Sequence, residues 1–274
     1  MCKSNTPSKI ELVLTCDEAR TLATIVAPCA SYDGYHSVLN GVAVSYDQCA
    51  GLEFCAADGS RLTHYVTPCD LGQMPAFKYI VPASVFDSVR TAKGDVEMVI
   101  EPEREITVTE GKHTSVSRGT VTVNGVTMAL IGGEYPRYHE LFPVESKFDG
   151  LMTPNDALAA LCKAAPVLNP RTNLITLTFA TDNTIAVRIK TENGGELNDG
   201  NVTTHVMELG APVTVCFNAN YLKHAFRLAE TVKKDKNGFM TMRVTGAGAL
   251  KPWVFYSKKH GADLRMLIMP VQAR

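Results

Sequence analysis

The sequence predicts an α+β protein made of two copies of one domain, each with antiparallel sheets and two helices. A length of 274 residues suits two domains of ordinary size. Helical and β-rich segments follow one another as helix, strands, helix, strands, and this order occurs twice. We therefore expect duplicated domains at 1–146 and 147–274, the alternative being a chance similarity of two unrelated domains.

The four helices are predicted from their caps and from apolar periodicity. Thr15 is the expected N-cap of the first helix, and Glu18 occupies the capping-box position. Thr153 caps the third helix, with Pro154 at the first helical position, which proline favours. Asn218 caps the fourth. The predicted ranges are 16–28, 83–92, 154–165 and 219–232.

Strands are predicted where β-branched and apolar residues alternate between turn residues. In the first domain these segments are 38–46, 52–56, 62–66, 79–82, 96–100, 106–109 and 121–131. In the second domain they are 174–180, 184–189, 213–217, 239–244, 253–257 and 264–269. The segment 192–201 is rich in glycine and asparagine, so we expect an exposed loop there.

Charge and hydropathy exclude several classes of protein. The 27 basic and 28 acidic residues give a net charge of −1, which excludes a strongly basic nucleic-acid binder. The sequence lacks a run of about 18 apolar residues, as a membrane-spanning helix would require. Residues 1–9 are polar and lack the apolar stretch of a secretory signal. We therefore expect a cytoplasmic protein with no membrane partner.

The sequence contains no recognisable catalytic or metal-binding pattern. Its eight cysteines include no Cys-x-x-Cys pair, so we expect reduced thiols rather than zinc ligands or disulfides. The seven histidines are scattered, and neither a nucleophile elbow nor a phosphate-binding loop is present. We expect no cofactor, no metal and no catalytic residues, hence a binding protein or scaffold rather than an enzyme.

The predicted helices contain more basic than acidic residues, whereas the rest of the chain is acidic overall. Basic helices on an acidic body suit helices that face a polyanion. The alternative is that the lysines near the end of the fourth helix simply complement its C-terminal dipole.

Several segments, taken together and in order, resemble one family. They include Ala-Asp-Gly-Ser-Arg-Leu at 57–62, Gly-Glu-Tyr-Pro-Arg-Tyr at 133–138 and Leu-Ile-Met-Pro-Val at 267–271, with further segments at 38–44 and 217–222. The chain resembles the second and third domains of the bacterial DNA polymerase III beta sliding clamps over nearly its whole length. The family has three domains per chain, so this chain resembles a short form that lacks the first.

The resemblance implies a ring that encircles duplex DNA without reading its sequence. Sheets would form the outer wall and helices would line the hole. Six domains per ring would require three copies of a two-domain chain, hence a homotrimer closed by head-to-tail contacts. The ring would tether a replicative DNA polymerase and would be loaded by a clamp loader, which makes it a processivity factor without catalytic activity.

The resemblance also implies a pocket that binds a short peptide from such partners, with an apolar wall and a few polar groups. Carried over by motif, the pocket residues are Leu39, Ala57, Gly59, Ser60, Arg61, Leu62, Pro136, Leu141, Asn218, Tyr221, Leu250, Leu267, Met269, Pro270 and Val271. The candidate DNA-facing residues are Arg20, Arg90, Lys93, Lys163, Lys223 and Arg227.

Two other functions remain open from the sequence. A clamp-like protein could bind or compete for clamp partners without encircling DNA, and ring stoichiometry separates this alternative from a true clamp. An enzyme built on duplicated α+β domains is the other, and it would need clustered polar residues in a deep pocket.

Overall fold

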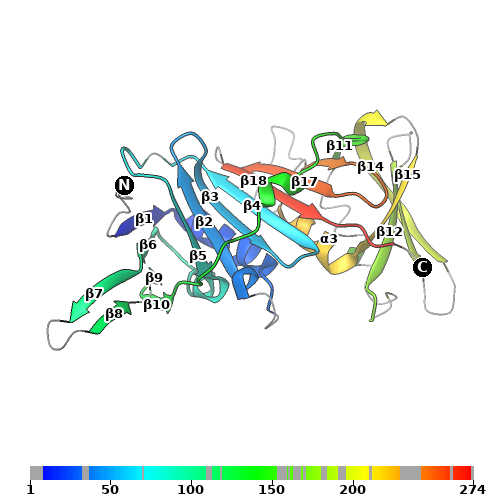
Figure 1. The fold of residues 1–274 in the computed structure, drawn as a ribbon. Helices are drawn as coiled ribbons and strands as arrows, with labels where there is room; N and C mark the ends of the chain where they lie inside the picture. The colour runs from blue at the N-terminus through cyan, green and yellow to red at the C-terminus, as the bar shows by residue number, and fades with distance from the viewer. Residues whose placement is uncertain are drawn as a thin grey trace. The chain divides into compact units, whose positions relative to one another are not determined.

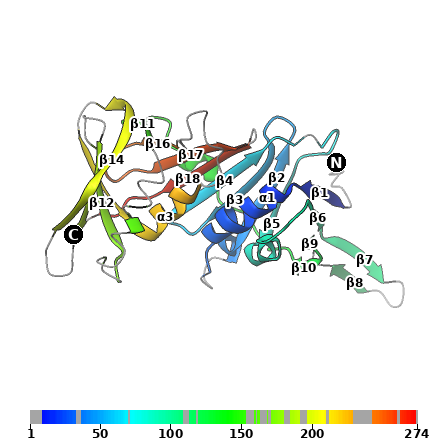
Figure 2. The same cartoon turned by 180° about the vertical axis from the view of Figure 1, so that it is seen from behind.

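The computed structural model (Figures 1 and 2) describes residues 9–32, 37–69, 71–108, 113–117, 119–152, 159, 161–162, 168, 171–179, 184–190, 196–209, 212–228, 242–259 and 262–272. The chain forms two compact units, Met1–Gly59 with Thr63–Pro136, and Ser60–Leu62 with Arg137–Arg274. All of the chain after Pro136 therefore belongs to the second unit, whereas the boundary predicted from the sequence follows residue 146.

The first unit contains a layer of four strands in the order β4-β3-β2-β5 and a four-stranded sheet in the order β1-β6-β9-β10. The first layer comprises β4 (Arg61–Thr67, whose residues 61–62 belong to the second unit), β3 (Gly51–Ala57), β2 (Gly41–Asp47) and β5 (Phe77–Pro82). The second comprises β1 (Ile10–Leu14), β6 (Val96–Glu101), β9 (Thr120–Val123) and β10 (Val126–Ala129), all paired antiparallel. The hairpin β7 (Arg104–Val108) and β8 (His113–Ser117) extends from this unit.

The first predicted helix is confirmed, together with its cap. Helix α1 (Cys16–Thr21) continues as a π-helical turn, Leu22–Val26, and a 3-10 turn, Ala27–Cys29. The Thr15 hydroxyl accepts from the Glu18 amide at 3.3 Å, and the Glu18 carboxylate accepts from the Thr15 amide at 2.8 Å. Thr24 donates to the Arg20 carbonyl at 2.7 Å, a side-chain bond that competes with the regular helical ladder.

The second helical segment, η4 (Ala83–Val89), is a 3-10 helix and is shorter than the predicted range 83–92. It begins after Pro82, which makes no side-chain capping bond. Val85, Phe86 and Val89 are buried. The segment packs against the preceding helical turns, which in turn pack on β3 (Figure 2). The helices thus cover one face of the strand layer and enclose the apolar core of this unit.

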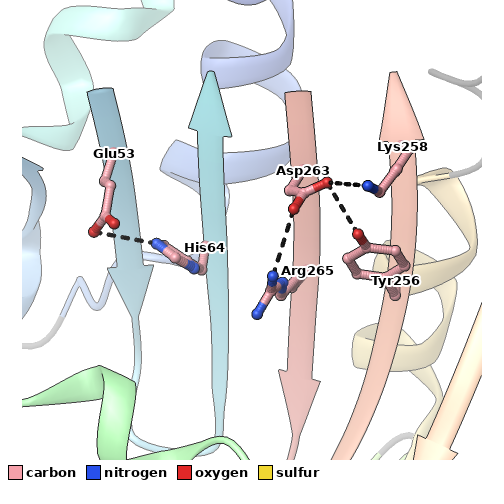
Figure 3. Close-up of polar contacts among 6 residues, drawn as sticks. All are labelled: Glu53, His64, Tyr256, Lys258, Asp263 and Arg265. Atoms are coloured by element: carbon pink, nitrogen blue, oxygen red, sulfur yellow. Dashed lines mark hydrogen bonds and ion pairs between the residues drawn. The ribbon is translucent and has the colours of Figure 1, made fainter. Parts of the chain in front are cut away.

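The first unit also buries a Glu–His pair. Glu53 on β3 and His64 on β4 are both about one-tenth exposed or less, and a Glu53 carboxylate oxygen lies 3.4 Å from His64 Nε2 (Figure 3). A carboxylate at this depth is stabilised by a nearby polar group, and the imidazole lies within ion-pair distance of it. This histidine therefore has a structural partner within the sheet.

The second unit contains strands in the order β15-β12-β13-β14-β11-β16-β17-β18. Neighbouring strands in this order pair antiparallel. The strands are β11 (Phe148–Met152), β12 (Leu174–Phe179), β13 (Thr184–Lys190), β14 (Glu196–Leu209), β15 (Val213–Asn218), β16 (Met242–Gly246), β17 (Trp253–Lys259) and β18 (Ala262–Ile268). One α-helix, α3 (Ala219–Arg227), follows β15 directly.

The prediction of an exposed loop at 192–201 is wrong for residues 196–201, which form the start of β14. Their composition favours turns, but Glu196 pairs with Lys190 and Asn201 pairs with Ala186 on β13. Ladder hydrogen bonds from a neighbouring strand thus outweigh the weak β-propensity of glycine and asparagine. Most of the third predicted helix, 154–165, lies outside the described residues.

The core of the second unit is built around the only tryptophan of the chain. The Trp253 ring centroid lies 4.6 Å from that of Phe179, 5.3 Å from that of Phe148 and 5.9 Å from that of Phe217. Its indole Nε1 donates to the Gly248 carbonyl at 2.9 Å. A Cβ at Gly246 would lie 2.4 Å from the indole, so this ring fits only because residue 246 has no side chain.

Among the described residues, the helices are all too short or too polar to span a bilayer.

Candidate functional site

The site begins with α3, whose position follows from local hydrogen bonds. The Asn218 side-chain oxygen accepts from the Asn220 amide at 2.9 Å, so the predicted cap is confirmed. The Ala219 amide donates to the Asn173 carbonyl at 2.7 Å, which attaches the first turn to the residue before β12. Helix α3 packs against β18, and its buried residues include Leu222 and Phe226, whose ring centroid lies 5.9 Å from that of Phe255 on β17. The opposite face of α3 is not covered by this packing, so other side chains can contact it.

Residues 60–62 belong to the second unit although they lie far earlier in the chain. The Met269 amide donates to the Ser60 carbonyl at 2.9 Å, which brings the two predicted pocket residues together. The Val271 amide donates to the Cys216 carbonyl at 2.8 Å. The segment 269–271 is therefore held between Ser60 and the strand that leads into α3.

Arg61 lies against the first turns of α3. Its guanidinium carbon is 4.6 Å from the centroid of the Tyr221 ring, a cation–π geometry. Its Nη1 is 2.9 Å from His224 Nδ1. Because a guanidinium group can only donate, the histidine nitrogen accepts this hydrogen bond. Tyr221 and His224 are three residues apart on the helix and so share one face.

This arrangement gives a positively charged, fixed group beside an aromatic ring. Both are suited to orient a peptide through its backbone carbonyls and apolar side chains. The sequence predicted Arg61 and Tyr221 as pocket residues but missed His224. The signal that identifies His224 is its spacing from Tyr221, which becomes informative only once Arg61 is placed.

Several of the predicted apolar pocket residues are unusually exposed. Met269 is 36% exposed, Val271 is 37%, Leu141 is 51% and Leu250 is 57%. They are among the few large apolar side chains that are exposed in the described part of the chain. Exposed apolar side chains indicate a binding surface where they lie together, and Met269 and Val271 are only two positions apart in the chain. Pro270 is half-buried between two of them.

Two predicted pocket residues are buried in the core of the fold. Leu62 and Leu267 are only 2% and 3% exposed. They contribute to the apolar layer beneath the surface and present little area of their own to a ligand. Four further predicted residues belong to the first unit, where Leu39 and Ala57 are half-buried and Gly59 and Pro136 are exposed.

Gly59 occupies the turn between β3 and β4. Its φ of +89° is in the region that residues with a Cβ rarely adopt. A Cβ at Gly59 would meet no atom within 4 Å, so backbone conformation and not crowding favours glycine there. The turn leads directly into Ser60 and Arg61.

The candidate DNA-facing residues are exposed wherever they are described. Arg20 is on α1, while Arg90 and Lys93 follow η4 in the same unit. Arg90 forms an ion pair with Asp87 at 2.9 Å, which reduces the free positive charge there. In the second unit, Lys223 and Arg227 are exposed and four residues apart on α3, so they share one face. Lys163 lies outside the described residues.

Comparison with solved structures identifies proteins of the same fold. The chain superposes on a DNA polymerase sliding clamp from Bacillus subtilis with a TM-score of 0.77 and 17% identity, over 100% of this chain and 67% of that one. The DNA polymerase III subunit beta from Pseudomonas aeruginosa gives 0.75 and 16%, over 100% and 69%. The beta subunit from DNA polymerase of Streptococcus pyogenes gives 0.74 and 17%, over 100% and 68%.

No family sequence model matches the chain, and no curated protein sequence is similar to it. The likeness is therefore one of structure, at a level of identity where sequence comparison alone gives no match. It extends over the whole of this chain and about two thirds of each clamp subunit. The predicted α+β clamp fold is thus confirmed, and the chain has the fold of the bacterial DNA polymerase III beta sliding clamps over about two thirds of their length.

Proposed function

We propose that the protein is a DNA sliding clamp that encircles duplex DNA and tethers a replicative polymerase. The observation that carries this proposal is the match of the entire chain to DNA polymerase sliding clamps. The two domains that the sequence predicts at 1–146 and 147–274 would correspond to the second and third domains of those clamps. Clamps act by topology and tethering, so the protein would make and break no covalent bond. Its proposed location is the cytoplasm.

The proposed assembly is a homotrimer. A ring of six domains needs three chains that contribute two domains each. Head-to-tail contacts between identical chains close into a ring when the rotation between neighbours allows it. A clamp loader would be needed to open such a ring around DNA that has no free end.

The proposed partner site is the surface around Met269, Val271, Arg61 and Tyr221. Exposed apolar side chains supply area that a partner peptide can bury, at roughly 25 cal/mol per Å². The Arg61 guanidinium, fixed by Tyr221 and His224, supplies a donor in a defined direction. Met269 has a flexible side chain, which suits the binding of more than one peptide sequence.

The proposed DNA contacts come from the exposed basic residues of the helices. Lys223 and Arg227 form the clearest pair, because they are exposed on one face of α3. Such contacts with phosphates depend on salt and ignore base sequence. A duplex held by topology needs only weak contacts of this kind, so a net charge of −1 is compatible with the proposed function.

The first experiment is the solution mass from light scattering over a range of protein concentrations. A mass of three times 29.7 kDa supports the ring. A stable monomer that still binds a polymerase peptide would favour the alternative, a clamp-like protein that competes for partners without encircling DNA. A dimer would contradict the proposed six-domain arrangement.

The second experiment tests encirclement on circular DNA. The loaded protein should remain on a closed circle and leave once the circle is cut, because a linear end releases a topological ring. The double variant Lys223→Gln with Arg227→Gln should lower retention and weaken its salt dependence. The control is Lys251→Gln with Arg171→Gln, which removes two exposed charges outside α3. Equal loss in both double variants would contradict the assignment of α3 to the DNA-facing side.

A further inference from the structure

A groove of about 360 Å³ lies on the solvent side of β16, β17 and β18 in the second unit. Its floor contains a row of side chains that face one another across the strands. Arg243 pairs with Tyr256, and Tyr256 pairs with Arg265, so the three residues occupy one register line. The Arg265 guanidinium carbon lies 5.4 Å from the centroid of the Tyr256 ring. The row is therefore arginine, tyrosine, arginine.

Carboxylates that do not line the groove hold both arginines in place. Asp149 on β11 accepts from Arg243 Nε at 2.9 Å and from Nη2 at 2.5 Å. Asp263 on β18 lies 3.5 Å from Arg265 Nη2. Each guanidinium thus has one edge fixed by a carboxylate. Arg243 is exposed and Arg265 is half-exposed, so the rest of each guanidinium is available to a ligand.

Asp263 is the centre of a small network (Figure 3). Its carboxylate also accepts from the Tyr256 hydroxyl at 2.9 Å and lies 3.4 Å from Lys258 Nζ. Burial and the bond to Asp263 raise the pKa of Tyr256, so its phenol stays neutral near pH 7. Asp149 and Asp263 supply two negative charges, whereas three cations surround them, namely Arg243, Lys258 and Arg265. The net charge of this group is therefore positive.

The other wall of the groove is apolar. Phe142, Pro143 and Val144 run along it, and Val254 contributes from β17. Val144 is fully exposed, at 101% of its reference area. Two charged residues line the groove, Arg243 and Arg265. One side of the groove thus suits an anion, and the other side suits an apolar side chain.

We propose that this groove binds an acidic peptide segment of a partner protein. Carboxylates of the peptide would contact Arg243 and Arg265, and an adjacent leucine or phenylalanine would pack against Phe142, Pro143 and Val144. The residues involved differ from those of the surface around Met269 and Arg61. The proposal therefore concerns a second surface and stands whether or not the protein forms a ring.

The chemistry of the lining favours a peptide over other anions. A free phosphate would use the guanidinium groups but would leave the apolar wall in water. A DNA backbone carries its charges at regular intervals and offers few apolar side groups to such a wall. A peptide can place a carboxylate and an apolar group on neighbouring residues, and the volume lies in the range of sites that hold such groups.

The test uses a fluorescent pool of hexapeptides composed only of Asp, Glu, Leu and Phe. A second pool carries Asn and Gln in place of the acids. Fluorescence anisotropy with the full chain should show saturable binding of the acidic pool and much weaker binding of the amide pool. The variant Arg265→Gln should weaken binding by about tenfold or more, because a charge-assisted contact is lost.

The matched control is Lys251→Gln, which removes one exposed charge elsewhere in the same unit. It should leave binding of the acidic pool unchanged, and thermal melts should show that both variants are folded. Absence of saturable binding, or equal weakening in both variants, would overturn the proposal. A 12-base-pair duplex is titrated in parallel. If Arg265→Gln weakens binding of the duplex and leaves the peptide pool unaffected, the groove binds DNA and the proposal is wrong.

Discussion

Replacement of Arg61 should destabilise the second unit by an amount that can be worked out from its two contacts. The cation–π contact with Tyr221 at 4.6 Å is worth about 0.5–1 kcal/mol at a partly exposed site. The 2.9 Å bond to His224 has a charged donor and contributes roughly 1.5 kcal/mol, at the low end because Arg61 is only half-buried. We therefore expect Arg61→Met to lower the free energy of unfolding by about 2 kcal/mol.

A double-mutant cycle isolates the hydrogen bond. His224→Phe keeps an aromatic ring of similar size in the buried position and removes the acceptor. Urea unfolding of the wild type, both single variants and the double variant should give a coupling energy of about 1.5 kcal/mol between residues 61 and 224. The fluorescence of Trp253 reports this unit directly, because the chain has one tryptophan and it lies in that core.

The control is Lys223→Met, which removes a long exposed cation from the same helix. It should change stability by less than about 0.5 kcal/mol, as surface substitutions usually do. A coupling energy below about 0.5 kcal/mol would lie within the additivity of independent sites and would refute the contact. In that case Arg61 could not be regarded as a fixed donor of the proposed peptide site.

Three other outcomes are expected. Met269→Ala should weaken binding of a labelled polymerase peptide by at least about tenfold while the oligomer mass stays the same, because anchors carry most interface energy; unchanged anisotropy titrations would contradict the pocket assignment. Gly246→Ala should destabilise the protein by about 1–3 kcal/mol through overlap with the indole, whereas Gly94→Ala, where a Cβ meets nothing, should be nearly neutral in urea unfolding. Stability should also fall as pH rises above the usual tyrosine pKa of 10.0, because the folded state raises the pKa of Tyr256 and favours its neutral form. Tyr256→Phe should reduce this alkaline loss of stability, and an identical pH profile in the variant would argue against a role of Tyr256.

The fold class was predictable from the sequence because its signals are repeated and local. Caps and periodicity each involve residues within a few positions, and the structure confirms them at Thr15, Glu18 and Asn218. The motif at 57–62 likewise directed attention to Arg61 and, with 217–222, to Tyr221. Local composition failed at 196–201, because a strand can be fixed by its neighbour in the sheet rather than by its own propensities.

The sequence by itself thus determined the order of helices and strands, the capped helix starts and the family resemblance. Only the tertiary structure decided which side chains meet. Arg61 and His224 are 163 positions apart, and no spacing rule links residues at that separation. The same holds for the arginine–tyrosine–arginine row, which depends on the registers of three strands. Local hydrogen bonds act over one helical turn and are written in neighbouring residues, whereas side-chain contacts between elements depend on how the whole unit packs.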